Sequence, residues 1–131
     1  MDSWTMRHEK RPFTVNGIYR SHHHVAAPQI KHWRETFKGL AEDIGLPAME
    51  RCHVTVWVEL KNRRSIPDTG ACYSAVKAAI DGLVDAGCLP DDGPEEIASI
   101  KMHAPVVTGV DALEIEVARA TSRLHDRPDT P

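Results

Sequence analysis

The sequence predicts an α+β fold in which a mixed β-sheet and two main helices pack as two layers. Two segments repeat apolar residues at intervals of three and four, as amphipathic helices do, and several shorter segments alternate apolar and polar residues, as strands do. The elements run strand, helix, strand, helix, strand, strand, and this order favours a mixed sheet. The 131 residues suit a single domain with one core.

The N-terminal third is predicted to hold one strand and the first helix. Residues 1–10 are polar and lack a period, so we expect a flexible arm there. A short strand or hairpin is expected near residues 11–20, where an Asn-Gly pair supplies turn chemistry. A helix is expected over residues 28–44, because Pro28 suits the first helical position and apolar residues then recur at helical spacing.

Four further elements are expected after the first helix, and the first of them contains an alternating run of valines. The expected ranges are 52–60 for a strand, 71–86 for the second helix, and 97–102 and 112–117 for two further strands. Residues 119–131 contain charges, two prolines and few apolar side chains, so we expect a flexible C-terminal tail. This division leaves residues 11–118 as the folded domain.

The composition favours a soluble cytoplasmic protein. The three cysteines, Cys52, Cys72 and Cys88, form no C-x-x-C pair, and their odd number does not suggest a disulfide framework. No apolar run approaches the roughly 18 residues of a membrane span, and the N-terminus lacks the apolar core of a secretory signal. We therefore expect no membrane partner.

Charge is unevenly distributed along the chain. The net charge of −3 argues against a generic nucleic-acid binder, yet residues 1–64 hold 11 Lys/Arg against 7 Asp/Glu, whereas residues 65–131 hold 5 against 12. The two parts thus carry +4 and −7. A basic part could contact phosphates while an acidic part binds metal, or both could be ordinary solvated surfaces.

The predicted second helix carries the most informative chemistry. Lys77 lies within it, and the acidic pair Asp91-Asp92 follows its end. A lysine near paired carboxylates can steady a phosphoryl group while the carboxylates hold a divalent metal. Helical spacing also places Asp81 one turn from Lys77, so the two could instead form a simple surface ion pair.

Several short segments, taken in order and spacing, resemble the RusA family of Holliday-junction resolvases, small dimeric phage and prophage enzymes that cut four-way DNA junctions with magnesium. The resemblance covers about residues 11–118. It rests on Asn16, Tyr19-Arg20, His24-Val25, Arg63-Arg64, Lys77-Ala78-Ala79-Ile80-Asp81, Ala86-Gly87, Asp91-Asp92, Lys101-Met102 and Leu113-Glu114-Ile115.

The resemblance implies a homodimer that binds branched DNA and uses Mg²⁺, or Mn²⁺, in recombination or repair. Asp92, Asp91 and Asp68 would bind the metal, and Lys77 would stabilise the transition state. Contacts to DNA are implied for Asn16, Arg20, His24, Arg63 and Arg64.

The chain departs from the family at the start of this helix. Family members usually carry Asp-x-Asp-Asn-x-x-Lys, but here Ala71, Tyr73 and Ser74 occupy the three acidic and amide positions. Neither an alanine nor a neutral tyrosine is a plausible magnesium ligand. Asp68 could reach the vacated place through the flexible Thr69-Gly70 pair, or it could simply cap the helix or form a turn. Asp91-Asp92 could likewise be a solvated turn.

Other site types find little support. The run His22-His23-His24, together with scattered cysteines and histidines, raises structural zinc, but no ligand pair has recognisable spacing. A cysteine hydrolase would need a histidine partner that the sequence does not single out. We therefore expect a RusA-like, magnesium-dependent endonuclease; the alternative is a RusA-fold protein without nuclease chemistry that binds DNA or a protein partner.

Overall fold

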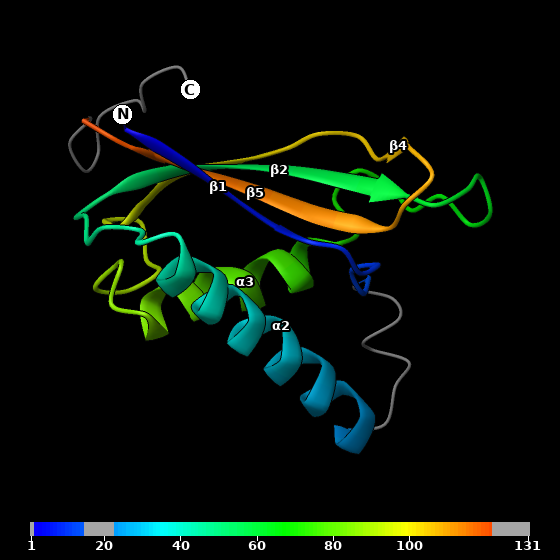
Figure 1. Cartoon of the computed structure of the whole chain (residues 1–131), viewed down its shortest axis with the longest axis horizontal. Helices are drawn as coiled ribbons and strands as arrows, with labels where there is room; N and C mark the ends of the chain where they lie inside the picture. The colour runs from blue at the N-terminus through cyan, green and yellow to red at the C-terminus, as the bar shows by residue number, and fades with distance from the viewer. Residues whose placement is uncertain (1, 15–22, 122–131) are drawn as a thin grey trace.

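The computed structural model describes residues 2–14 and 23–121, and its elements form two layers (Figure 1). The two helices, α2 and α3, lie on the same face of the sheet. The helices are α2 (His23–Asp43) and α3 (Tyr73–Asp85), and the strands are β1 (Ser3–His8), β2 (Cys52–Leu60), β3 (Ile97–Met102), β4 (Val106–Val107) and β5 (Ala112–Arg119). The predicted α+β class, with a mixed sheet and two helices, is confirmed.

The sheet has the strand order β1-β5-β2-β3, and β4 also pairs with β2. Strands β1 and β2 are antiparallel to β5, whereas β2 is parallel to β3 and β4. Parallel neighbours need a crossover connection, and α3 supplies it between β2 and β3. This crossover runs on the same face of the sheet as α2 (Figure 1).

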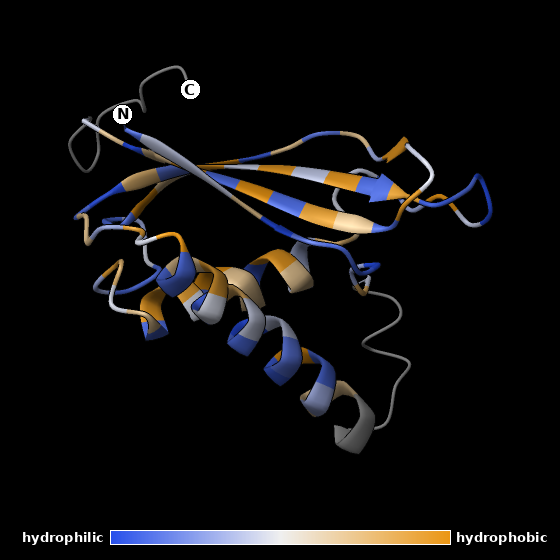
Figure 2. Cartoon of the chain, viewed as in Figure 1, coloured by the Kyte–Doolittle hydropathy of each residue, from blue (hydrophilic) through white to orange (hydrophobic). Residues whose placement is uncertain are grey.

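The core lies between the sheet and the helices. Alternate residues of β2 and β5 are fully buried there, as Figure 2 shows by the alternation of apolar and polar residues along these strands. The helices contribute large apolar side chains at helical spacing. The principal core residues are Val54, Val56, Val58, Leu113, Ile115 and Val117 from the sheet, and Trp33, Phe37, Val76, Ile80 and Leu83 from the helices.

The two helices approach each other closely at Gly82. A Cβ atom at this position would lie 2.3 Å from the carbonyl oxygen of Arg34 and 2.9 Å from the backbone nitrogen of Lys38. Only a residue without a side chain fits against the α2 backbone here. Gly82 therefore fixes how α3 docks on α2.

Residues 3–8 form a strand, whereas the sequence had predicted a flexible arm over residues 1–10. Strand β1 pairs along its whole length with β5, from Ser3 opposite Ala118 to His8 opposite Leu113. Its one fully buried side chain is Met6. A strand with so few apolar residues gives a weak pattern in the sequence, and it forms because β5 offers an unpaired edge.

Helix α2 begins at His23, five residues before the predicted start, so Pro28 lies inside the helix. Proline at this sixth helical position cannot donate the backbone hydrogen bond to the residue four positions earlier, so the start of α2 has one such bond fewer. The other predicted boundaries agree closely: β2 and β3 match, α3 begins two residues later, and β5 extends to Arg119.

Two predicted segments lie largely outside the described residues. The expected strand and turn near residues 11–20 lie largely outside the described residues, and those that are described, 11–14, form no strand. Most of the expected C-terminal tail also lies outside. Within the described ranges, no helix has the length and apolar character needed to cross a membrane.

Candidate functional site

Lys77 lies between two carboxylates. Its Nζ donates a hydrogen bond to Asp81 Oδ1 at 2.8 Å, one helical turn along α3, and a second to Asp92 Oδ2. Asp92 reaches this place because Gly87, with φ of 81°, ends the helix in a left-handed conformation and lets the chain turn. The expected ion pair with Asp81 is thus formed, and Asp92 joins it.

The charges of this group are mutually stabilised. Partial burial opposes the charge of Lys77, but its bonds to Asp81 and Asp92 outweigh that effect and raise the pKa of the ammonium group. The hydrogen bond from Lys77 is the main reason that the pKa of Asp92 falls below its usual value. Asp91 lies beside it, and its Oδ1 accepts the backbone N–H of Asp92 at 2.8 Å.

A second ion pair lies one turn further along α3. Arg34 of α2 donates to both oxygens of Asp85, with Nε to Oδ2 at 2.5 Å and Nη2 to Oδ1 at 2.8 Å. This two-point geometry holds the pKa of Asp85 below its usual range. We refer to Asp81, Asp85, Asp91 and Asp92 as the carboxylate cluster. Lys77 and Arg34 supply its cations.

Asp68 is not part of this cluster. It lines a separate open cavity of about 680 Å³ with Arg11, Ser65, Ile66 and Ala71 among its neighbours. The N-cap position of α3 belongs to Cys72 and has no side-chain cap bond, so Asp68 is not the helix cap. The carbonyl oxygen of Asp68 instead accepts the N–H of Ala71 in a turn at 2.9 Å.

The predicted magnesium ligands therefore fall into two places. Asp91 and Asp92 lie beside Lys77, while Asp68 lines the cavity before α3. Across residues 2–14 and 23–121, no three His, Cys, Asp or Glu side chains are grouped as a metal site requires. Tyr73 and Ala71 add no carboxylate. The residues described do not fit a complete magnesium site, since Lys77 occupies the space between Asp81 and Asp92.

The loop that follows β2 projects from the sheet at the right of Figure 1. Its sequence includes the basic residues Lys61, Arg63 and Arg64. Arg63 and Arg64 are exposed in this loop. The loop is held by its backbone, since Asp111 accepts the N–H of Lys61 at 2.8 Å and Asn62 accepts that of Arg64 at 2.9 Å. The arginine side chains are thereby displayed on an ordered turn.

Two more basic residues, Lys10 and Arg11, reach this loop from the other side. Arg11 Nη2 donates to the carbonyl oxygen of Ser65 at 2.6 Å. Lys10 and Lys61 line a shallow cavity with Glu9 and Asp111 among its walls. We call Lys10, Arg11, Lys61, Arg63 and Arg64 the basic end. Lys10 and Arg11 were not predicted as binding residues, although two adjacent basic residues are the same signal that singled out Arg63 and Arg64.

The cations of the basic end differ from those of the carboxylate cluster in their pairing. Among the described residues, no side chain forms an ion pair with Lys10, Lys61, Arg63 or Arg64. Cations without carboxylate partners are available to an external anion. The basic end is thus the part of the described molecule best suited to phosphate.

The remaining predicted site residues lie mostly outside the two regions described above. Asn16 and Arg20 lie outside the described residues, and His24 lies in the first turn of α2 with its side chain outside them. The cysteines are buried thiols; burial raises the pKa of Cys52 to about 12 and that of Cys72 to about 11. Such thiols are poor nucleophiles at neutral pH.

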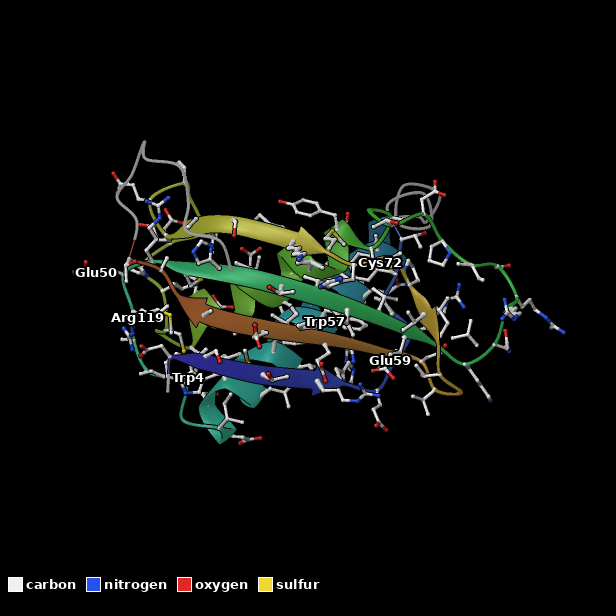
Figure 3. All side chains as sticks on the ribbon, turned by 90° about the horizontal axis from the view of Figure 1, so that it is seen from above. Trp4, Glu50, Trp57, Glu59, Cys72 and Arg119 are labelled. Carbon is white, nitrogen blue, oxygen red and sulfur yellow. The ribbon has the colours of Figure 1, made fainter. Side chains whose placement is uncertain are left out.

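The face of the sheet opposite the helices carries mixed charge (Figure 3). Trp57 and Glu59 of β2 lie on it, and the Trp57 ring stacks on His103 with centroids 5.1 Å apart. Arg7 pairs there with Glu59 and lies 3.7 Å from Glu114. Its acidic residues make this face less suited to nucleic acid than the basic end.

Comparison with known proteins identifies no family for this chain. No protein-family model matches the chain, and no curated protein matches it significantly.

Proposed function

We propose that this protein is a RusA-like DNA-binding protein that contacts the phosphates of branched DNA through the basic end and has little or no nuclease activity. The observation that carries the proposal is the contrast in pairing. The cations beside the carboxylate cluster are neutralised within the molecule, whereas Lys61, Arg63 and Arg64 have no carboxylate partner among the described residues.

The preference for branched DNA rests on the resemblance to junction resolvases, as do a homodimer and a role in phage or prophage recombination and repair. A dimer would present two basic ends to opposite arms of a junction, which would strengthen binding through a second linked contact. The buried, unbridged cysteines suit a reducing compartment, and we propose that the protein acts in the cytoplasm.

The second candidate is the magnesium-dependent endonuclease that the family pattern implies. It is favoured by the position of Asp91 and Asp92 beside Lys77. Magnesium commonly completes its oxygen ligands with water and substrate phosphate, so a site could be completed only on bound DNA. Lys77 would have to leave Asp92 to reach a phosphate.

A synthetic four-way junction separates the two candidates. Binding is measured by fluorescence anisotropy in EDTA and in Mg²⁺ or Mn²⁺, and nicking is followed on the same samples. We expect tight binding to the junction, weaker binding to linear duplex, and no nicking. The matched variants are Arg63→Ala/Arg64→Ala at the basic end and Lys31→Ala on α2, where Lys31 is exposed and pairs only loosely with Glu35 at 3.8 Å.

The outcomes are distinct. Weaker binding by the double variant and unchanged binding by Lys31→Ala would support the proposal. Metal-dependent nicking that disappears in Asp92→Asn would establish the endonuclease instead. If neither junction nor duplex binds, the DNA proposal is wrong and a protein partner becomes the next candidate.

A further inference from the structure

Two histidines from different elements meet at the edge of the sheet. His8 is the last residue of β1, and His32 lies on α2. Their Nε2 atoms are 3.1 Å apart, with ring centroids separated by 5.2 Å. Neither residue belongs to the basic end or to the carboxylate cluster.

The separation of these nitrogens suits a shared metal ion. Zinc binds imidazole nitrogen at about 2.0–2.1 Å in tetrahedral geometry, which places two such ligands about 3.3 Å apart. The observed 3.1 Å lies within a few tenths of an ångström of that separation. We propose that His8 and His32 bind a divalent transition metal of the imidazole-preferring class, with Zn²⁺ as the ion available in cells.

The surroundings of the histidine pair are partly apolar. The buried Trp33 ring lies edge-on to His8 at 5.0 Å and forms an apolar wall beside the pair.

The site would be open and exchangeable. Among the described residues no third His, Cys, Asp or Glu joins the pair as a ligand group, so water would complete the coordination. Imidazole suits zinc, copper and nickel, whereas magnesium prefers oxygen, so this site differs in chemistry from the magnesium implied by the family pattern. A metal here would fasten the edge strand β1 to α2.

A hydrogen bond between the two imidazoles is the alternative for the same geometry. One neutral ring can donate its Nε2–H to the Nε2 of the other at this distance. Such a pair needs no metal and would hold β1 to α2 more weakly. The two possibilities differ in their response to added metal.

Trp33 provides a direct readout, because bound Cu²⁺ quenches the fluorescence of a nearby indole. The full chain is freed of metal with EDTA and titrated with Cu²⁺ while tryptophan emission is recorded, and thermal unfolding is measured with and without Zn²⁺. The variants are His8→Gln and His32→Gln, which keep a polar side chain. A third variant, His22→Gln/His23→Gln/His24→Gln, removes the separate histidine run seen in the sequence.

We expect saturable quenching at one Cu²⁺ per chain and a higher unfolding temperature with Zn²⁺, because an ion that binds only the folded state stabilises it. Both effects should persist in the triple variant and disappear in each single variant. Equal quenching in His8→Gln and the original protein would overturn the proposal. So would quenching lost only in the triple variant, or the absence of saturable binding, which would leave the hydrogen bond as the role of the pair.

Discussion

Along α3 and in the turn that follows it, the cations and carboxylates bond to each other, whereas in the loop that leads into α3 the cations face solvent. Lys77 and Arg34 are held by Asp81, Asp92 and Asp85. Arg63 and Arg64, in the loop that leads into α3, have no such partner among the described residues. One helix therefore connects a region where charge stabilises the fold to a region where charge is available for binding.

A lysine near acidic residues can therefore have two opposite roles. In a metal-dependent nuclease the carboxylates hold metal and the lysine faces the phosphate. In this protein the ammonium group takes the position between Asp81 and Asp92. The function of the region then depends on whether DNA or metal can separate that ion pair.

The largest expected effect comes from the close contact between the helices. Gly82→Ala should destabilise the fold by about 3 kcal/mol, because the new methyl group would lie against the α2 backbone at Arg34. Urea unfolding, monitored by circular dichroism, measures the change. The variant should also disturb the pairing of Arg34 with Asp85, since both residues depend on the spacing of the helices.

Gly39→Ala on α2 is the matched control for this substitution. Apart from the helix's own backbone, nothing lies within 4 Å of an added Cβ there, so alanine should stabilise the helix by about 0.5–1 kcal/mol. If the two variants unfolded at the same urea concentration, the close docking of α3 on α2 would be contradicted.

A smaller effect on stability is expected where Lys77 bonds to Asp81 and Asp92. Lys77→Met should cost about 1 kcal/mol at pH 7, since it leaves Asp81 and Asp92 facing each other without a cation and the group is partly exposed. Junction binding should be unchanged. A large loss of junction binding in this variant would instead place Lys77 at the DNA and remove the contrast between the two ends.

The pH dependence of that cost follows from Asp92. Lys77 lowers the pKa of Asp92 in the folded state, so its contribution is fully present above the unfolded pKa of about 3.9. The contribution is lost as pH falls through the lower folded pKa. The stability difference between the original protein and Lys77→Met should therefore be constant from pH 7 to 5 and shrink below about pH 4. Urea unfolding at each pH measures this difference. A difference that grew in acid would contradict the role of Asp92.

The sequence predicted the elements that have strong periodicity. Strand β2 alternates Val54, Val56 and Val58, and α3 repeats apolar residues with a glycine just beyond its end, so both were located within two residues. Strand β1 was missed because its pairing with β5 is a long-range contact. Its own residues carry too little apolar pattern to reveal it.

The candidate site was only partly predictable for a related reason. The bond between Lys77 and Asp81 follows from helical spacing alone. The approach of Asp92 to Lys77, and of Arg34 to Asp85, depends on how a turn and a second helix return to α3, which no local pattern encodes. The expected role of Asp68 in the same site assumed that a flexible turn would fold toward Lys77, but this residue lines the cavity beside Arg11.

The salt dependence of junction binding is the sharpest test of DNA binding at the basic end. The slope of log K against log salt is negative, and each phosphate contact that is lost lowers its magnitude by about 0.9. We predict that Arg63→Ala/Arg64→Ala lowers the magnitude of the slope by about 2, whereas Lys31→Ala leaves the slope unchanged. Equal slopes for the original protein and the double variant would contradict the assignment of DNA binding to the basic end.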